Sequence, residues 1–516
     1  MTGRGEVTTR RPVARAVAGI VAAAVALGVG ELASVLVGPD SSPFLAVGSV
    51  TVDRSPAWAR EFAITTFGTH DKPALFVGMS AVIVAIAALA GLMERPRGPY
   101  GSAILALLGV VGVSAAVSRP GATWTAALPT VVGVALGVVV LRLLTAAAVT
   151  PAPPASGASW PSRRRFLLLA GAAVAFAAGA GALGARAGQR LAGVLENRRG
   201  VTLPSVADRA APIPAGADVA VPGGTSFLTP DDTFYRIDTA LRVPRLRTDE
   251  WRLRIHGLVD RELTLTWDDL RRRTPIERAI TLTCVSNDVG GSLAGNAVWI
   301  GYRVDELLDE VGVRPDADML LSTSVDGFTV GTPVAVLRDG RDAMLAVAMN
   351  GEPLPLAHGF PVRQVVPGLY GFVSATKWVV DWELTRFDRA QAYWTRRGWA
   401  AQAPIKTASR IDVPAAFASV PAGRLVVAGT AWAQHRGIAA VEVRVDEGAW
   451  HAATLAPSYS VDTWRQWTWE WDASAGTHAL QVRATDLDGS VQTPERRTPI
   501  PDGATGWHSR TITVER

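Results

Sequence analysis

Long apolar runs dominate residues 1–190, whereas residues 200–516 mix apolar and polar positions as a folded globular protein does. Five runs have close to the roughly 20 residues that a helix needs to cross the hydrocarbon core of a bilayer. They cover Ala16–Val37, Pro73–Leu92, Tyr100–Val117, Trp124–Leu141 and Phe166–Ala185. The pattern therefore predicts a transmembrane helical bundle of about five spans over residues 1–190.

The distribution of basic residues predicts the orientation of these spans. Arginines gather before the first span, between the second and third, and between the fourth and fifth: Arg4, Arg10, Arg11, Arg15, Arg95, Arg97, Arg142 and Arg163–Arg165. Loops rich in Lys and Arg stay on the cytoplasmic side. We therefore expect a multi-pass protein of the cell membrane, in contact with lipid. Its N-terminus would be cytoplasmic, and the catalytic part after Ala185 would be extracytoplasmic.

The entrance to the fifth span has a more specific pattern. The order Ser162-Arg163-Arg164-Arg165-Phe166-Leu167 resembles the twin-arginine export signal. That route exports folded proteins, which suits a domain that takes up a cofactor before export. The alternative is a stop-transfer helix flanked by ordinary cytoplasmic arginines.

Two polar residues of the first half bear on function. Glu31 lies within the first span, where a carboxylate is a candidate functional group; the alternative is a place near the outer interface. Of the seven histidines, His70 alone precedes residue 200. Haem between helices commonly needs two histidine ligands, so we do not expect a haem of that kind here.

The pattern changes after the spans. Residues 191–230 read as a linker, and residues 200–232 are rich in Pro, Gly and Asp and predict an irregular segment. Trp251–Val259 and Leu263–Trp267 alternate apolar and polar positions, as half-buried strands do, and a short helix is expected from Asp268. Arg303–Val311 has apolar residues on one helical face and ends at Gly312. This mixture without regular βαβ alternation predicts an α+β domain over residues 231–395.

Strand-like runs at short spacing fill the last part of the chain. They are Arg424–Ala428, Ala440–Val445, Trp464–Trp471, His478–Ala484 and Ser509–Val514. No helical period interrupts them, so residues 396–516 predict an immunoglobulin-like β-sandwich. Trp467, Trp469 and Trp471 share one strand face, which is typical of packing.

Composition narrows the chemistry. A formal net charge of +5 is small for 516 residues, and no basic helix is interleaved with aromatic residues, so we expect no nucleic-acid partner. Cys284 is the single cysteine and cannot form a disulfide within the chain. Its thiolate, at a corner between a strand and a glycine-rich turn, is well placed to bind a soft metal.

Five further segments complete the pattern around Cys284. They are Phe234–Asp238, Ser324–Phe328, Met349–Arg363, Val366–Gly371 and Ala375–Trp378. In this order and spacing they strongly resemble the sulfite-oxidase family of molybdenum–molybdopterin oxidoreductases. The Asn-Gly-Glu-Pro-Leu-Pro to His-Gly-Phe-Pro-Val-Arg run is the most specific part. The resemblance covers Asp231 to the C-terminus, and the spans lie outside it.

The resemblance implies a Mo-molybdopterin cofactor and a role for each matching position. Cys284 would be the protein thiolate on molybdenum, with two further sulfurs supplied by the pterin dithiolene. The implied catalytic residues are Cys284, Arg236 and Asp288. Arg236, His358 and Arg363 would bind the pterin and its phosphate, and Asp326 would hydrogen-bond the pterin ring. The remaining implied cofactor-binding residues are Tyr235, Ile237, Asp238, Ala375, Thr376 and Lys377.

Three departures argue against sulfite as the substrate. Asp288 and Val289 stand where sulfite oxidases have an Arg-Arg pair, and an aspartate beside the metal would repel an anion. The family's Arg-Asn-His becomes Arg236-Ile237-Asp238. The region of the active-site tyrosine reads Trp394–Trp399, with Arg396 in the tyrosine's place.

We therefore expect two-electron oxygen-atom transfer on a small-molecule substrate other than sulfite. One alternative is a reductase of S-oxides or N-oxides, including methionine sulfoxide; another is a non-catalytic scaffold of the cell envelope. No Cys-x-x-Cys-His haem motif is present, so electrons would pass through a separate partner, a quinone or a cytochrome. Family analogy implies a homodimer formed through the C-terminal domain.

Overall fold

The computed structural model describes residues 5–37, 41–56, 59, 62, 66–67, 71–95, 98–119, 122–149 and 191–516. The chain divides into two compact units, Met1–Gly193 and Val194–Arg516. The predicted fifth span and the twin-arginine-like segment lie outside the described residues. So does most of the loop that precedes them.

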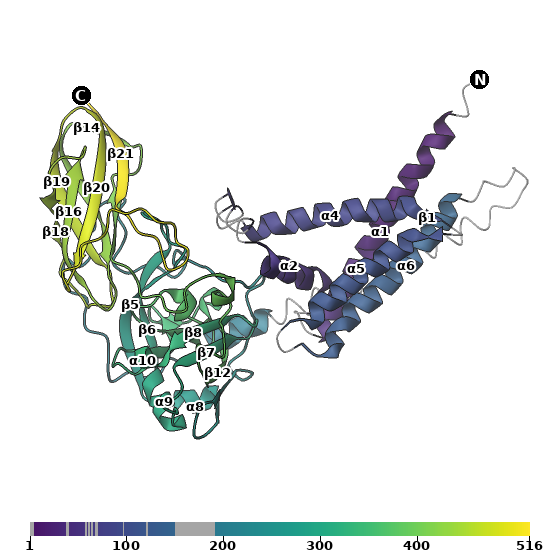
Figure 1. Ribbon diagram of the computed structural model, residues 1–516, viewed down its shortest axis with the longest axis horizontal. Coiled ribbons are helices and arrows are strands. Elements are labelled where there is room, and N and C mark those ends of the chain that lie inside the picture. The colour runs from purple at the N-terminus through teal and green to yellow at the C-terminus, as the bar shows by residue number, and fades with distance from the viewer. Residues whose placement is uncertain are drawn as a thin grey trace, which may run out of the picture. The chain divides into compact units, whose positions relative to one another are not determined.

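Long helices make up the described part of the first unit (Figure 1). They are α1 (Gly5–Val37), α2 (Pro43–Arg54), α4 (Asp71–Met93), α5 (Tyr100–Val117) and α6 (Leu128–Val149), with the short strands β1 (Glu94–Arg95) and β2 (Gly98–Pro99) and the 3-10 helix η3 (Trp124–Ala127). Four stretches are long and apolar enough to cross a membrane: Arg15–Val37, Lys72–Met93, Tyr100–Val117 and Trp124–Ala146. These agree closely with the first four predicted spans.

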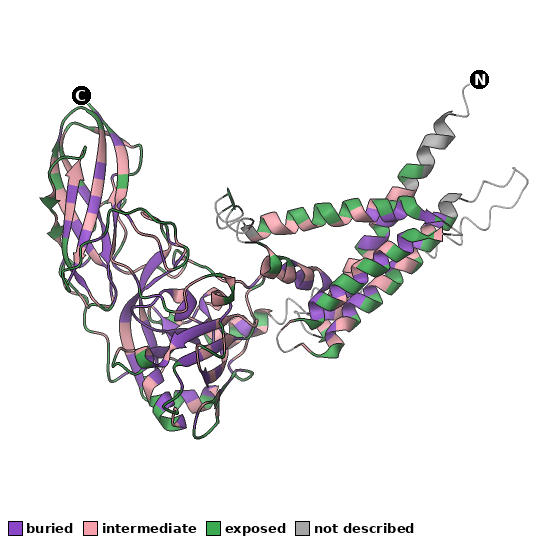
Figure 2. Cartoon of the chain, in the orientation of Figure 1, coloured by how far each residue is buried: buried purple, intermediate pink, exposed green. Residues whose placement is uncertain are grey.

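The surfaces of these helices are apolar where a soluble bundle would be polar. Val77, Leu107, Val110 and Leu143 are each more than 60% exposed. Figure 2 shows exposed positions along each of these long helices. Such a surface is stable when lipid covers it, because exposing it to water is unfavourable. The unit is therefore compatible with membrane anchoring.

Glycines let α1 approach its neighbours closely. A Cβ added to Gly91 of α4 would lie 1.9 Å from the carbonyl oxygen of Arg15, and one added to Gly133 of α6 would lie 2.2 Å from that of Ala26. Small residues permit this backbone approach in helices that pack within a bilayer. The carboxylate of Glu31 accepts a hydrogen bond from the Ser42 hydroxyl at the start of α2.

Two sheets form the α+β part of the second unit, in the strand orders β10-β9-β6-β5 and β4-β3-β12-β7-β8, with β11 paired to β9. The strands of the first sheet are β5 (Pro275–Thr283), β6 (Ala294–Arg303), β9 (Met344–Met349), β10 (Glu352–Pro353) and β11 (Arg363–Val365). Those of the second are β3 (Arg252–Gly257), β4 (Leu263–Thr266), β7 (Met319–Ser324), β8 (Thr329–Pro333) and β12 (Val379–Thr385). Pairing is antiparallel except between β12 and β3.

Short helices connect these strands, and two of them, α8 and α9, are predicted from the sequence. They are α8 (Trp267–Arg271), α9 (Val304–Val311), α10 (Val334–Leu337) and the 3-10 helices η4 (Leu356–His358), η5 (Gly371–Val373) and η6 (Thr395–Arg397). In α9 the apolar face is buried, and Gly312 ends the helix with a φ of 66°. In α8 a capping box joins Thr266 and Asp269, which satisfies backbone donors at the helix start. The irregular segment predicted before β3 is also present.

The C-terminal part contains two sheets around one core. Their orders are β13-β15-β19-β18 and β14-β21-β20-β16-β17. The strands are β13 (Ala408–Val413), β14 (Ser419–Pro421), β15 (Gly423–Trp432), β16 (Ile438–Val445), β17 (His451–Ala452), β18 (Thr454–Leu455), β19 (Arg465–Ala473), β20 (Gly476–Asp486) and β21 (His508–Glu515). Trp467 is fully buried between the sheets, and Trp469 and Trp471 pack against the same core, so this aromatic row has a packing role. The immunoglobulin-like assignment of this sandwich stays a prediction.

The sandwich part holds the strand that leads to Cys284. The amide of Thr281 in β5 donates to the carbonyl of Asp462 at 2.9 Å, and the Thr281 hydroxyl accepts from the amide of Trp464 at 2.8 Å. The side-chain amide of Gln434 donates to the Thr283 hydroxyl at 2.8 Å. These hydrogen bonds from the C-terminal part of the chain fix the position of β5.

The turn after Cys284 is held in the same way. Arg410 donates to the carbonyl of Gly291 at 2.7 Å. Gly290 has a φ of +80°, and a Cβ added there would lie 2.1 Å from Cδ2 of the His508 ring. His508 is fixed in turn because its Nδ1 accepts from the amide of Ile411 at 3.0 Å.

We predict that Gly290→Ala lowers the free energy of unfolding by about 2 to 4 kcal/mol, because it adds both backbone strain and a clash with His508. Guanidinium denaturation of the full chain in mild detergent measures this. Gly489→Ala is the control: its φ is +84° with open space around it, so it should cost about 1 kcal/mol. Equal effects of the two substitutions would contradict the close contact.

Candidate cofactor site

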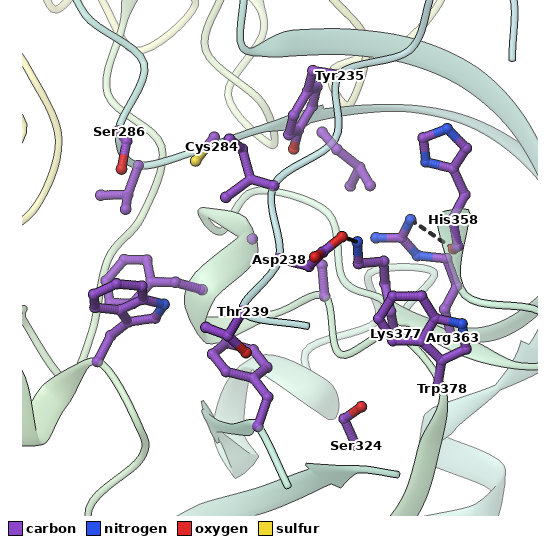
Figure 3. Close-up of a pocket in the computed structure, with 18 of the residues that line it drawn as sticks. Tyr235, Asp238, Thr239, Cys284, Ser286, Ser324, His358, Arg363, Lys377 and Trp378 are labelled. Atoms are coloured by element: carbon purple, nitrogen blue, oxygen red, sulfur yellow. Dashed lines mark hydrogen bonds and ion pairs between the residues drawn. The ribbon is translucent and has the colours of Figure 1, made fainter. Parts of the chain in front are cut away.

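A cavity that is open to solvent lies in the second unit where several strand ends and loops meet (Figure 3). Its lining residues are Phe234, Tyr235, Ile237, Asp238, Thr239, Leu282, Cys284, Val285, Ser286, Ser324, Asp326, Phe328, His358, Arg363, Gly371, Phe372, Ala375, Lys377, Trp378, Trp394 and Trp399.

Cys284 lies at the point where β5 ends. Its amide donates to the carbonyl of Leu293 at 2.9 Å, and its own carbonyl accepts from the amide of Asn287 at 3.1 Å, which turns the chain. The side-chain oxygen of Asn287 closes this turn by accepting from the amide of Leu293 at 2.8 Å. The thiol is buried and lines the cavity.

The thiol of Cys284 is neutral by itself. Burial raises its pKa above the ordinary value, although hydrogen bonds from Ser286 partly oppose the shift. A bound metal cation reverses this balance, because its charge holds a coordinating thiol deprotonated. In the described part of the chain no three His, Cys, Asp or Glu side chains gather as a metal-binding group. A metal at Cys284 would therefore take its other ligands from a cofactor.

Three basic side chains lie together across the cavity from Cys284 (Figure 3). His358 is the last residue of η4, Arg363 begins β11, and Lys377 follows η5. Arg363 donates to the carbonyl of His358 at 3.2 Å and lies 5.0 Å from the centre of the Trp299 ring. Lys377 lies 4.7 Å from the centre of the Trp378 ring. Aromatic packing thus holds both cations in place.

Burial makes positive charge unfavourable in this cluster. It lowers the pKa of His358 to about 4 and that of Arg363 to about 10. It lowers the pKa of Lys377 to about 8, even though Asp238 favours the charged form. His358 is therefore neutral near pH 7, while Arg363 is charged. A bound anion would relieve the cost of burying these charges.

Asp238 joins the cluster to Arg236. Its carboxylate is 2.7 Å from Nζ of Lys377 and 2.7 Å from Nε of Arg236. Arg236 itself is exposed and does not line the cavity. The structure thus places Arg236, which the resemblance implied to be catalytic, where it orients Asp238 rather than contacting the cavity.

The remaining predicted residues divide into two groups. Tyr235, Ile237, Asp326 and Ala375 line the cavity. Asp326 also fixes the turn before β8, because its carboxylate accepts from the amide of Phe328 at 3.3 Å.

Asp288, Thr376 and Arg396 do not line the cavity. Asp288 is exposed on the turn after Cys284, so the expectation that it repels anions beside the metal loses its geometric basis. Arg396 is likewise exposed in η6 and does not replace the missing tyrosine at the site. Thr376 is fully buried behind the lining.

Unpartnered polar atoms test whether an anionic cofactor fits. Nε of Arg363 and Oγ of Ser324, on two residues that line the cavity, are buried without a hydrogen-bond partner in the part of the chain that the structure describes. Buried donors without partners are costly, which favours a bound group that supplies acceptors. Together with the cation cluster and the thiol, they fit a cofactor with a phosphate at one end and a metal at the other.

The sequence patterns indicated Tyr235 but missed three other aromatic residues of the lining. Phe372, Trp394 and Trp399 contribute rings to the cavity. In the run from Trp394 to Trp399 the sequence indicated Arg396 as the site residue, whereas the two tryptophans line the cavity. No periodicity in this run could have found them, because residues five apart do not share one face of a helix.

Comparisons with known proteins agree with this site. The family described as "Oxidoreductase molybdopterin binding domain" matches residues 240–394. The chain is 33% identical over 150 residues to the uncharacterized oxidoreductase YuiH of Bacillus subtilis (strain 168), which covers 29% of this chain and 72% of that protein. It is 28% identical over 316 residues to the mitochondrial sulfite oxidase of Drosophila melanogaster, which covers 51% of this chain.

The chain spans about half the length of that sulfite oxidase, 53%. Among solved structures, the sulfane dehydrogenase SoxCD from Paracoccus pantotrophus superposes with a TM-score of 0.50. It shares 24% identity, and the match covers 57% of this chain and 84% of that one. The likeness supports the fold of the second unit.

The fold and site define a molybdopterin-binding oxidoreductase. The chain belongs to the sulfite-oxidase-type family of molybdopterin-dependent oxidoreductases, and membership implies a Mo-molybdopterin cofactor.

The low pKa of His358 predicts a loss of stability in acid. The pKa of His358 is 6.5 in the unfolded chain and about 4 in the folded chain, so the unfolded chain binds the proton more readily. The contribution of neutral His358 to folding stability is therefore complete above pH 6.5 and is lost as the pH falls toward 4. The expected loss is about 3 kcal/mol. Thermal unfolding of cofactor-free protein at pH 7 and pH 4.5 measures it.

His358→Gln should make the unfolding temperature less sensitive to this pH change. His478→Gln is the control, because hydrogen bonding to Asp446 raises the pKa of His478 and its contribution has the opposite sign. An unchanged acid response in His358→Gln would refute the assignment.

Proposed function

We propose that this protein is a membrane-anchored, extracytoplasmic molybdopterin oxidoreductase that transfers an oxygen atom in a two-electron reaction. The observation that supports this most directly is the placement of the Cys284 thiol on the same cavity as His358, Arg363 and Lys377. A single cavity can then hold a metal at one end of a cofactor and its phosphate at the other.

Each residue has a defined part in holding the cofactor. Cys284 supplies a thiolate to the metal, and Arg363 and Lys377 bind the phosphate through charge-assisted hydrogen bonds. His358 is neutral and donates or accepts one hydrogen bond. The molybdenum cofactor supplies two-electron oxygen-atom transfer when bound, while the protein orients it and excludes water.

Asp238 keeps the cation cluster ordered. Its carboxylate pairs with both Lys377 and Arg236. The first pair fixes the direction of the Lys377 side chain, while Arg236 remains outside the cavity lining. Asp326 and the backbone near Ala375 are positioned to contact the pterin, because both line the cavity. We propose these as binding positions.

The substrate is proposed to be a small molecule other than sulfite. Once the cofactor phosphate engages Arg363 and Lys377, the described lining offers no further lysine or arginine for an anionic substrate. A reductase of S-oxides or N-oxides uses the same site in the opposite direction. Electrons would enter or leave through a separate partner, a quinone or a cytochrome, and the sandwich would serve as the surface of a homodimer.

Cofactor content is the direct test. Purified, correctly matured protein should contain molybdenum and pterin in equal amounts, and Cys284→Ser should lower turnover with any accepted substrate by at least about a hundredfold. Elemental analysis, pterin fluorescence and a dye-coupled assay measure these quantities.

Ser292→Ala, on the exposed part of the same turn, is the matched control and should keep wild-type content and turnover. Correctly matured protein that contains neither molybdenum nor pterin would contradict the proposal. Wild-type turnover of the Cys284→Ser protein would contradict the role of the thiol as a metal ligand.

The proposed orientation has its own test. Asp488→Cys places a thiol on an exposed turn of the sandwich, and a membrane-impermeant maleimide should label it in intact cells. Thr2→Cys, near the basic N-terminus, should be labelled only after lysis. The reverse pattern would contradict an extracytoplasmic catalytic part.

A further inference from the structure

Lys377 and Trp378 are consecutive residues, and both line the cavity. Successive side chains of an extended strand point to opposite faces. Trp378 directly precedes β12 and has a φ of 50°, in the left-handed region that bulky residues rarely adopt. This backbone conformation breaks the alternation, so that both side chains can face the cavity. Strained backbone of this kind persists where the surrounding contacts hold it in place.

Three contacts of Trp378 join separate segments of the cavity lining. Its indole Nε1 donates to the carbonyl of Leu356, the first residue of η4, at 3.0 Å. Its backbone carbonyl accepts from the amide of Val325, in the turn between β7 and β8, at 2.9 Å. The centre of its ring lies 4.7 Å from Nζ of Lys377. Because Trp378 is only 1% exposed, water does not compete for these contacts.

The helix η4 also contacts Lys377 directly. Nζ of Lys377 donates to the carbonyl of Ala357 at 3.2 Å. Gly359, which ends η4 with a φ of 112°, approaches so closely that an added Cβ would lie 3.3 Å from Cα of Lys377. Since His358 is the last residue of η4, the position of Trp378 affects His358 and Lys377 together. Figure 3 shows the indole on the same side of the cavity as these basic side chains.

We propose that Trp378 is a positioning residue, which holds Lys377 and His358 in the arrangement that binds an anion before the anion arrives. This inference rests on the proposed function, in which these residues bind the phosphate of the cofactor. A preorganised site binds more tightly, because less conformational freedom is lost when the ligand binds. The hydrogen bond from the indole to Leu356 is the contact that a substitution can remove while an aromatic ring stays beside Lys377.

The affinity for inorganic phosphate measures this arrangement without the cofactor. Phosphorus NMR titration of the cofactor-free full chain in mild detergent gives the Kd. Trp378→Phe removes the N–H donor and keeps a ring, and we expect it to weaken phosphate binding about fivefold. Trp378→Leu also removes the ring beside Lys377, and we expect a loss of at least about tenfold.

Trp464→Phe is the matched control. Trp464 is also 1% exposed, and its indole donates to a backbone carbonyl, that of Phe227, at 2.9 Å. Neither residue lines the cavity. Trp464→Phe should therefore lower the Tm to a similar extent as Trp378→Phe and leave the Kd for phosphate unchanged. If Trp378 had a purely structural role, the two variants would bind phosphate equally well.

Wild-type phosphate affinity in folded Trp378→Phe protein would overturn the inference, as would an equal loss of affinity in Trp464→Phe. Wild-type protein that binds no phosphate would overturn it as well. If Trp378→Phe does not fold, Trp378→His is compared with Trp464→His by the same criterion. Molybdenum and pterin are measured separately on matured wild-type protein. Their absence overturns the proposed function, whereas the phosphate titrations decide the role of Trp378.

Discussion

The burial of positive charge in the same cavity as a neutral thiol is the constraint on which the rest of the site depends. Arg363 is buried with its Nε unpartnered, and the Lys377 side chain, which is 10% exposed, is paired with Asp238. Neither arrangement is favourable by itself, because burial depresses the pKa of both cations. An anionic cofactor that also brings a metal to Cys284 satisfies both ends of the cavity at once.

The C-terminal sandwich contributes to this site although it does not line it. Gln434 bonds to Thr283 in β5, and Arg410 and His508 contact Gly291 and Gly290 in the turn after Cys284. A metal-binding thiol must be held within a fraction of an ångström, which a free strand end cannot do. The sandwich therefore serves as a rigid support for the residue at which we place the metal.

Local patterns predicted much of this fold, and contacts between distant segments did not follow from them. The apolar face of Val304–Val311 and its Gly312 stop specify α9 without any tertiary information. The motif spacing around Cys284 and Arg363 identified residues that meet in one cavity. It could not show that Asp288 points to solvent or that Arg236 turns away, since side-chain direction in a turn depends on packing. The indoles of Trp394 and Trp399 were missed for the same reason.

The central claim is that the thiol of Cys284 binds molybdenum. X-ray absorption at the molybdenum edge counts the sulfur atoms around the metal in purified protein. We expect three sulfur ligands in the wild type, two from the cofactor and one from Cys284, and two in Cys284→Ser protein that retains its cofactor. An equal sulfur count in the two proteins would contradict it.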